Sequence, residues 1–363
     1  MIGFGKGSLV NQRRCSRCVL PETYPGIVFD KNGVCHLCRS YHKPHVKGED
    51  ELRRIITPSK RGKYDCLVTL SGGRDSSYVL YYATKILGLR VLAFSYDNGF
   101  RHVQALKNIK AACRRLGTDL VESHSRDNLN ARITAHALHA TIPFGPGAAC
   151  RFMCRPCYNG GLAFLYSLAE EYNIPFVLWG DSLVEKLTFT QVRNKALGAG
   201  TPLQYVCSSR CLSFFKFLYL LLVQRNERLP SGNLPFDPRY PRLKNRNILE
   251  LHLFDYIEWD RREIKRVITE ELGWQKPPES LSTWRFDCHL HGLLNYCHKK
   301  AIGFNHDVDG LANMVRAGKM DQAEALDLIE KGFDSAEWTG ELEELTRRVL
   351  RLPESDINAM KSW

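Results

Sequence analysis

The sequence contains no run of about 18 consecutive apolar residues, which is the length that a membrane-spanning helix needs. Its most apolar stretch, Leu212 to Val223, is shorter and contains Lys216, so it predicts a buried helix. The N-terminal sequence, MIGFGKGSLVNQRR, lacks the long apolar core of a secretory signal peptide. We therefore expect a cytoplasmic protein without a membrane span.

The composition is that of a folded protein with an anionic partner. A length of 363 residues predicts two lobes or one domain with additions, and a hydrophobic content of 44% supports a core. The net charge of +12 suits a polyanion such as ATP, a nucleotide sugar or tRNA. Thirteen cysteines in a chain that we expect in the cytoplasm indicate metal binding or catalysis rather than disulfides.

The stretch YDCLVTLSGGRDSS, residues Tyr64 to Ser77, predicts a phosphate-binding turn. Its apolar run Asp65 to Leu70 has the length and β-branched content of a buried strand. Ser71-Gly72-Gly73 then allows a tight turn, and a helical pattern continues to Leu87. A strand, a glycine turn and a helix start together form a nest of backbone N–H groups that binds phosphate. The pattern G-x-x-x-x-G-K-[ST] is absent, so this is not a Walker A loop.

Side chains around this turn add to its binding capacity. Hydroxyl donors come from Ser71, Ser76 and Ser77, while Arg74 adds a positive charge and Asp75 is a candidate ligand of Mg²⁺. The alternative is an ordinary turn that precedes a helix.

The six residues SGGRDS, 71–76, resemble the SGG-[KR]-D-S signature of the PP-loop ATP pyrophosphatases, although Lys is commoner where Arg74 stands. The resemblance implies cleavage of ATP to AMP and pyrophosphate, adenylation of a carbonyl oxygen, and displacement of AMP by a nitrogen or sulfur nucleophile. It also implies catalytic roles for Arg74 and Asp75. It assigns ATP binding to Leu70, Ser71, Gly72, Gly73, Ser76 and Ser77.

The order of the elements predicts an α/β fold with a doubly wound parallel sheet, Rossmann-like and of the PP-loop or HUP type. Later strands are expected at Arg90–Tyr96, Asp119–Ser123, Ile174–Trp179 and Ile248–Phe254. Ligands bind at the carboxyl ends of such strands, so Asp97, Gly180 and Asp181 are candidate ATP-binding residues. For Asp97 a simple turn is the alternative.

Four cysteines near the N-terminus have the spacing of a structural metal site. The pairs Cys15/Cys18 and Cys35/Cys38 form two C-x-x-C knuckles, which can present four thiolates to one tetrahedral ion. We expect Zn²⁺, with iron less favoured, and a role in folding the segment. Free surface cysteines are the alternative.

The sequence around these knuckles resembles the opening of the N-acetyl sugar amidotransferase family. The shared pattern is C-x-x-C-V-x-P-x-T-x-P-G-I-x-F-D-x-x-G-V-C-x-x-C, residues 15–38. The resemblance implies ammonia transfer to an adenylated acetamido sugar or nucleotide sugar in surface-polysaccharide biosynthesis. No glutaminase signature is visible, so a separate glutaminase subunit would supply ammonia. Residues 183–188 depart from the family pattern, which puts the acceptor in doubt.

A second group of cysteines, Cys150, Cys154 and Cys157, lies just before a helical pattern. An Fe–S cluster, a second Zn²⁺ and reduced structural thiols all fit this spacing, and we take Cys154 and Cys157 as candidate catalytic residues. The rival function is a PP-loop sulfurtransferase that acts on tRNA or a nucleobase. It would use Cys154 and Cys157 for a 4Fe-4S cluster or a persulfide, together with one of Cys150, Cys207, Cys211 or Cys288.

A third hypothesis is a zinc-knuckle module that binds nucleic acid and has a decayed ATP site, but the intact residues 71–76 argue against it. Nearer the C-terminus, Asp287, His289 and His291 are candidates for proton transfer, although each alone is more often a packed or solvated residue. We expect a zinc-binding segment at 1–50, the PP-loop domain at 51–275 and a helical C-terminal region at 276–363.

Overall fold

The computed structural model describes residues 12–56, 62–182, 210–226, 248–334 and 337–363. Within them, five parallel strands form one sheet in the order β3-β2-β1-β4-β5. The strands are β1 (Cys66–Thr69), β2 (Val91–Asp97), β3 (Asp119–His124), β4 (Phe176–Trp179) and β5 (Leu249–His252). This confirms the predicted doubly wound parallel sheet.

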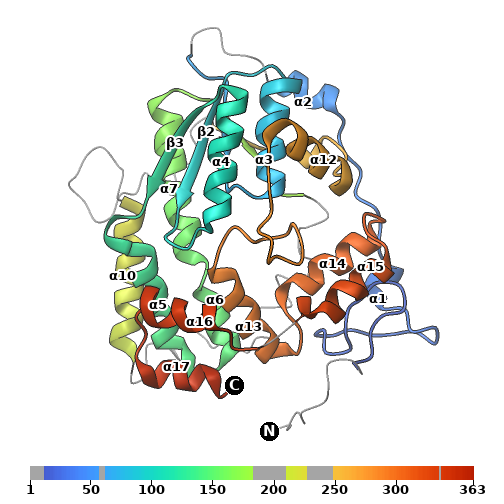
Figure 1. Cartoon of the computed structure of the whole chain (residues 1–363), viewed down its shortest axis with the longest axis vertical. Coiled ribbons are helices and arrows are strands. Elements are labelled where there is room, and N and C mark those ends of the chain that lie inside the picture. Colours follow the sequence, from blue (N-terminus) through green and yellow to red (C-terminus); the bar gives the residue numbers. More distant parts are fainter. Residues whose placement is uncertain (1–11, 57–61, 183–209, 227–247, 335–336) are drawn as a thin grey trace.

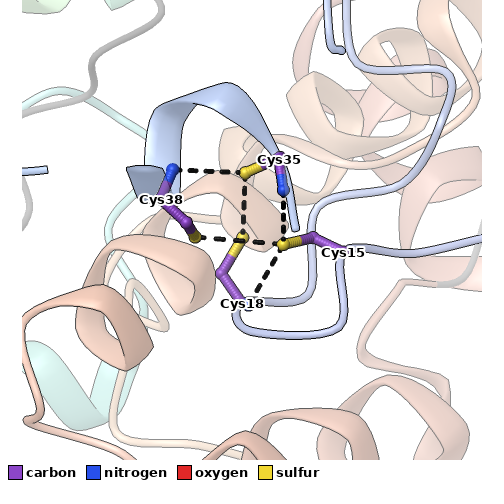
Figure 2. Close-up of side chains that lie close together, drawn as sticks. All are labelled: Cys15, Cys18, Cys35 and Cys38. Carbon is purple, nitrogen blue, oxygen red and sulfur yellow. Dashed lines mark hydrogen bonds between the residues drawn. The ribbon is translucent and has the colours of Figure 1, made fainter. Parts of the chain in front are cut away.

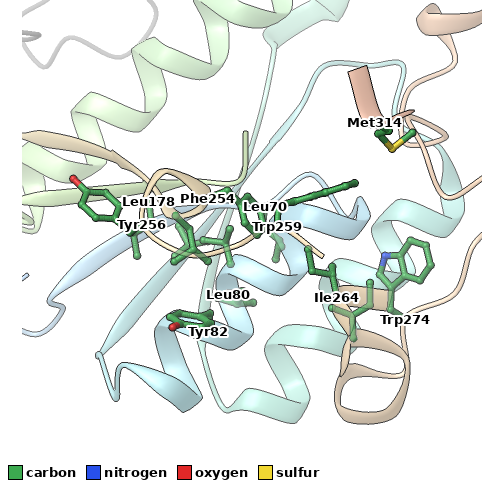
Figure 3. Close-up of a cluster of buried hydrophobic side chains, with 14 of the residues drawn as sticks. Leu70, Leu80, Tyr82, Leu178, Phe254, Tyr256, Trp259, Ile264, Trp274 and Met314 are labelled. Carbon is green, nitrogen blue, oxygen red and sulfur yellow. The ribbon is translucent and has the colours of Figure 1, made fainter. Parts of the chain in front are cut away.

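Successive side chains of a strand point to opposite faces of the sheet, so the buried core is divided between the two faces. Cys66 and Val68 of β1 join one buried cluster, while Leu67 between them joins another. Helices α3 (Arg74–Tyr81), α4 (Val103–Leu116) and α12 (Arg261–Leu272) cover the first face. Figure 3 shows part of this cluster around α3 and α12. Helix α7 (Arg155–Glu171) covers the second face.

The strand order creates a crevice beside β1. The chain passes from β1 outward to β2 and β3, and then returns to the other side of β1 with β4. The connections that leave the carboxyl ends of β1 and β4 therefore diverge. Such a switch point is where open α/β sheets bind ligands.

Further helices gather at one end of the sheet, and those that follow α12 form the predicted helical C-terminal region (Figure 1). Before β4 in the chain come α5 (Leu129–Thr141) and α6 (Pro146–Phe152). The C-terminal helices are α13 (Leu290–Ile302), α14 (His306–Arg316), α15 (Gln322–Leu328), α16 (Gly340–Glu344) and α17 (Glu354–Lys361). Helices α6, α13 and α17 share one buried cluster, which joins this region to the rest of the molecule.

Helix α10 (Cys211–Asn226) corrects one expectation, because it is not buried all round. Phe214 and Phe217 pack against α5 and α6, whereas Leu212, Phe215 and Tyr219 are more than half exposed. The helix is apolar on several faces, and only one of them contacts the described core. Among the described residues, no helix combines the length and the apolarity that crossing a membrane requires.

The N-terminal segment contains α1 (His36–Arg39) and α2 (Glu49–Ile55). Its four cysteines share a buried cluster with residues of the sheet and of α14. The cluster thus contains residues from both sides of the domain boundaries expected after residues 50 and 275, and these boundaries stay predictions.

Candidate active site

The turn after β1 needs glycine at position 72 for two reasons. Gly72 has a φ of +82°, and a Cβ atom there would lie 2.2 Å from the carbonyl oxygen of Ala105. The Gly72 carbonyl accepts hydrogen bonds from Trp274 Nε1 at 3.0 Å and from Asn108 Nδ2 at 3.2 Å. The turn is thus held against α4 and against the segment that follows α12.

Of the three serines at the turn, two present their hydroxyl groups to the cavity and one is buried. Ser71 Oγ lies 3.1 Å from Ser76 Oγ and accepts a hydrogen bond from the backbone N–H of Gly73 at 3.2 Å. Ser77 is buried, and its hydroxyl donates to the carbonyl of Gly73 at 2.7 Å. Ser71 and Ser76 therefore face the open side of the turn, while Ser77 stabilises the start of α3.

A cavity of about 490 Å³ lies at the carboxyl ends of β1 and β4. Ten of the residues predicted for the site line it: Leu70, Ser71, Gly73, Arg74, Asp75, Ser76, Cys154, Cys157, Gly180 and Asp181. Three others, Gly72, Ser77 and Asp97, are absent from the lining. The structure thus brings together most of the candidate nucleotide-binding residues with two of the central cysteines.

Asp97 points away from the cavity lining and makes local contacts. Its carboxylate accepts hydrogen bonds from the backbone N–H of Gly99 at 2.9 Å and from Arg101 Nη2 at 3.3 Å. Its neighbour Asn98 lines the cavity instead. A role of Asp97 in nucleotide binding stays a prediction.

Arg74 and Asp75 form a buried ion pair beside the cavity. The guanidinium donates through Nε and Nη2 to the two carboxylate oxygens, at 2.9 and 2.8 Å. Trp259 Nε1 donates to the same carboxylate at 3.1 Å, and the guanidinium lies 4.9 Å from the centre of the Trp259 ring. Arg74 Nη1 also donates to Thr283 Oγ1 at 3.0 Å. In this arrangement Asp75 anchors a buried cation, and its role as a ligand of Mg²⁺ stays a prediction.

The end of β4 approaches the turn closely. A Cβ atom on Gly180 would lie 3.1 Å from the backbone of Asp75 and Ser76. Asp181 follows at the rim, where its side chain is 64% exposed and lies 3.5 Å from His252 Nδ1. A side chain at position 180 would therefore crowd the backbone of the turn, and Asp181 is accessible to a ligand.

Three cysteines from two distant segments line the same cavity: Cys154, Cys157 and Cys288. Asn98 Nδ2 lies 3.4 Å from Cys157 Sγ and 3.6 Å from Cys288 Sγ. Burial raises the pKa of Cys288 to about 12 and also raises the pKa of Cys157 well above its ordinary value. Cys154 is exposed. The thiols of Cys157 and Cys288, whose pKa is raised, become thiolates only when a nearby cation or a bound metal stabilises the negative charge.

The other candidate partners of these cysteines lie elsewhere. Cys150 is buried, with its Sγ 3.9 Å from the carbonyl of Leu294, and belongs to the core cluster that also contains Cys297. Cys211 begins α10 and does not line the cavity. Cys207 lies outside the described residues.

A histidine and a carboxylate meet at the cavity wall formed by α13. His291 lines the cavity, and its Nε2 lies 2.8 Å from Asp307 Oδ2. Asn295 Nδ2 donates to the same oxygen at 2.8 Å. Burial alone would raise the pKa of Asp307, but His291 and His306 together outweigh burial and hold the pKa well below its ordinary value. Asp287 also lines the cavity, whereas His289 does not.

Residues 274–285 also belong to the site, and sequence reasoning missed their contacts with the turn. Trp274 donates to the Gly72 carbonyl, Thr283 accepts from Arg74, and Trp284 and Arg285 line the cavity. The signal was the dense run of residues that begins at Trp284, which suggested proton transfer by Asp287, His289 or His291 and a sulfur ligand in Cys288.

The N-terminal cysteines form a separate candidate metal centre (Figure 2). All four Sγ atoms lie within 4.8 Å of one another, with 3.9 Å between Cys15 and Cys38 and 3.8 Å between Cys18 and Cys35. A tetrahedral ion with metal–sulfur bonds of about 2.3 Å places its ligands about 3.8 Å apart. The four thiols therefore fit the predicted ion, which would supply folding energy when bound.

Positive charge and backbone donors surround these four thiols. Arg316 Nη1 from α14 lies 3.4 Å from Cys18 Sγ, and the backbone N–H of Cys35 donates to Cys15 Sγ at 3.2 Å. The Cys18 thiol and the nearby backbone N–H groups lower the pKa of Cys15. Hydrogen bonds with the neighbouring thiols instead raise the pKa of Cys18, so the four sulfur atoms share protons and would release them to a bound metal.

No protein-family model matches the sequence. The uncharacterized protein MJ1599 of Methanocaldococcus jannaschii is 22% identical over 345 residues, which are 93% of this chain and 100% of the relative. NMN synthetase from Francisella tularensis has a TM-score of 0.27 and 17% identity, over 56% of this chain and 95% of that chain. The U34-tRNA thiolase NcsA from Methanococcus maripaludis with its 4Fe-4S cluster has a TM-score of 0.35 and 14% identity, over 94% of this chain and 99% of that chain. These overall similarities are weak, so function is argued from the residues of the cavity.

Proposed function

We propose that this chain is an AMP-forming ATP pyrophosphatase of the PP-loop type, which activates a carbonyl oxygen by adenylation. The observation that carries the proposal is the cavity at the switch point of the sheet, with the turn Ser71-Gly72-Gly73 and the start of α3 in its wall. Backbone N–H groups and a helix N-terminus stabilise the charge of phosphates there. Mg²⁺, when bound, would neutralise further phosphate charge.

Adenylation gives the reaction a leaving group. A carbonyl or amide oxygen leaves poorly, whereas AMP leaves well, so an incoming nucleophile can replace the oxygen after activation. Ser71 and Ser76 supply hydroxyl donors at the cavity, and the Arg74–Asp75 pair fixes the first turn of α3. Asp181 is placed at the rim, where it can meet a nucleotide or its metal ion.

The test is to identify the products of ATP with candidate acceptors, using acetamido sugars with ammonium in one series and tRNA with sulfide in another. AMP and pyrophosphate in equal amounts are expected. The variant Asp75→Asn keeps the side-chain volume but removes the charge that holds Arg74, and should reduce product formation at least about 100-fold. Formation of ADP and phosphate would contradict the proposal.

For the nucleophile, sulfur is favoured by the three thiols of the cavity. The cavity that contains the turn is also lined by Cys154, Cys157 and Cys288. Cys157 and Cys288 are more than 130 residues apart in the sequence, so the fold brings them together. Three thiolates fit an iron–sulfur cluster with one iron left for another ligand, and such a cluster would supply a site for sulfur. We therefore infer an ATP-dependent sulfurtransferase that acts on tRNA or a nucleobase. The net charge of +12 suits tRNA.

Ammonia transfer to an acetamido sugar or nucleotide sugar is the second candidate. It is favoured by the pattern of residues 15–38, which resembles the N-acetyl sugar amidotransferases. A glutaminase subunit would then supply ammonia, and the product would belong to surface-polysaccharide biosynthesis. Both candidates place the chain in the cytoplasm, where ATP and reduced cysteines are available.

Isotopic labelling separates the two candidates. Incubation with ATP, labelled ammonium and labelled sulfide, and with both acceptor classes present, should give sulfur in RNA or a nucleobase under the first candidate. Labelled nitrogen in an acetamido sugar would instead establish the second.

A further inference from the structure

Two arginines line the cavity, and only one of them has its charge balanced. Arg74 is held by both oxygens of Asp75 and lies over the ring of Trp259. Arg285 is exposed, and within the described residues no hydrogen bond or ion pair engages its guanidinium. Among the described residues, Arg285 therefore gives the cavity a positive charge without an ion-pair partner.

The backbone at Arg285 adopts an unfavourable conformation. Its φ is +43°, in the left-handed region that residues with a Cβ atom rarely occupy. Such conformations persist where the surrounding structure determines them, and they gather at ligand-binding sites.

The neighbours of Arg285 explain why this conformation persists. Before it, Thr283 accepts a hydrogen bond from Arg74, and the Trp284 ring lies so close to α14 that a Cβ atom on Gly310 would be 2.5 Å from it. After it, the Phe286 ring packs against Trp274 at 5.6 Å between centroids. Arg285 is thus held between two anchored residues.

We propose that Arg285 binds the phosphates of the nucleotide, and that its strained backbone keeps the guanidinium at the cavity. This inference rests on the proposed use of ATP and deepens it. A guanidinium forms paired, charge-assisted hydrogen bonds with phosphate oxygens. Arg74 cannot supply this charge without leaving Asp75, so Arg285 is the cavity arginine whose guanidinium can turn to a phosphate. The phosphates then lie between the N–H groups of the turn and Arg285.

The sequence supplies a matched control in Arg351. It is also an exposed arginine with a positive φ, +51°, but it does not line the cavity. Replacement of either arginine by glycine relieves the same kind of backbone strain, while only Arg285→Gly removes a charge from the cavity.

The experiment measures equilibrium binding of MgATP, magnesium pyrophosphate and adenosine to the full chain and to four variants: Arg285→Gln, Arg285→Gly, Arg285→Lys and Arg351→Gly. We expect Arg285→Gln and Arg285→Gly to bind MgATP roughly 10- to 100-fold more weakly, with adenosine binding unchanged. Arg285→Lys should be intermediate, because it keeps the charge without the paired geometry. Arg351→Gly should match the wild type.

Each outcome decides between the proposals. MgATP binding within twofold of wild type in both Arg285→Gln and Arg285→Gly overturns the role of Arg285 and leaves the use of ATP intact. If the wild type binds no MgATP, the proposed function fails and this inference falls with it. Arg285→Gly also guards against misfolding, because it removes the strain that Arg285→Gln retains.

Discussion

Single residues of the cavity are fixed by close contacts rather than by flexible surface interactions. Gly72 has no room for a Cβ atom beside Ala105, and Gly180 has little room beside Asp75. Arg74 and Asp75 hold each other in a buried pair. At this scale, the requirement is for small residues and matched charges at defined positions.

Substitution of Gly72 tests the close approach. We expect Gly72→Ala to destabilise the fold by about 1–3 kcal/mol more than Gly88→Ala, because the new methyl group must displace the backbone of α4. Gly88 is the matched control, because its φ is also positive, +67°, but no atom lies within 4 Å of the position that a Cβ atom would take. Gly88→Ala should therefore destabilise the fold by about 1–2 kcal/mol through backbone strain alone. Denaturant unfolding measures both, and equal losses would contradict this explanation.

The residues of the turn could be predicted because they are contiguous and carry a strand–glycine–helix pattern. Their partners could not. Trp259, Trp274 and Thr283 contact the turn across separations of 184, 202 and 209 residues, and no local pattern reveals such contacts. Cys288 was only one of four possible companions of Cys154 and Cys157 until the fold brought it to the cavity.

Buried histidines predict an acid-sensitive fold. Burial lowers the pKa of His306 and of the partly buried His136, because an imidazolium loses hydration there. An unfolded histidine titrates near pH 6.5, so below that pH the unfolded chain binds more protons than the folded one. Their stabilising effect is therefore full above about pH 6.5 and is lost as the pH falls through the lowered pKa values. In His306→Gln, the loss of unfolding free energy between pH 7 and pH 5 should be smaller than in wild type, and an unchanged loss would refute this origin.

Among the elements, α14 connects the two candidate sites. Asp307 in its first turn holds His291 at the cavity wall, and Arg316 in its last turn contacts Cys18 of the metal centre. The N-terminal knuckles therefore support the helix that helps to form the cavity. The sequence predicted a helical C-terminal region, but it gave no sign that one of its helices contacts both sites.

Replacement of Arg316 tests this connection. Arg316→Met keeps a long side chain but removes the positive charge beside Cys18, and should weaken metal binding by about 10- to 100-fold in competition with a chelator. Arg266→Met, on the exposed face of α12 between Glu263 and Glu270, is the matched control and should leave metal binding unchanged. Equal metal retention in all three proteins would contradict the role of Arg316.

For the whole molecule, the strand order places the turn after β1, the three cysteines and the C-terminal helices around one cavity. The fold class was predictable from the alternation of strands and helices. The choice between sulfur and nitrogen was not, because the resemblance near the N-terminus favoured ammonia, while the association of the cysteines appeared only in three dimensions.

We propose above all that the turn and the three cysteines form one site for ATP-dependent sulfur transfer. The sharpest experiment determines the metal and acid-labile sulfide content of the full chain purified without oxygen, in wild type, Cys288→Ser and Cys150→Ser. We predict about one zinc with about four iron and four sulfide per chain in wild type and in Cys150→Ser. Cys288→Ser should lose the iron and sulfide while it keeps the zinc. A wild-type protein with zinc but without iron or sulfide would contradict the proposal and favour ammonia transfer.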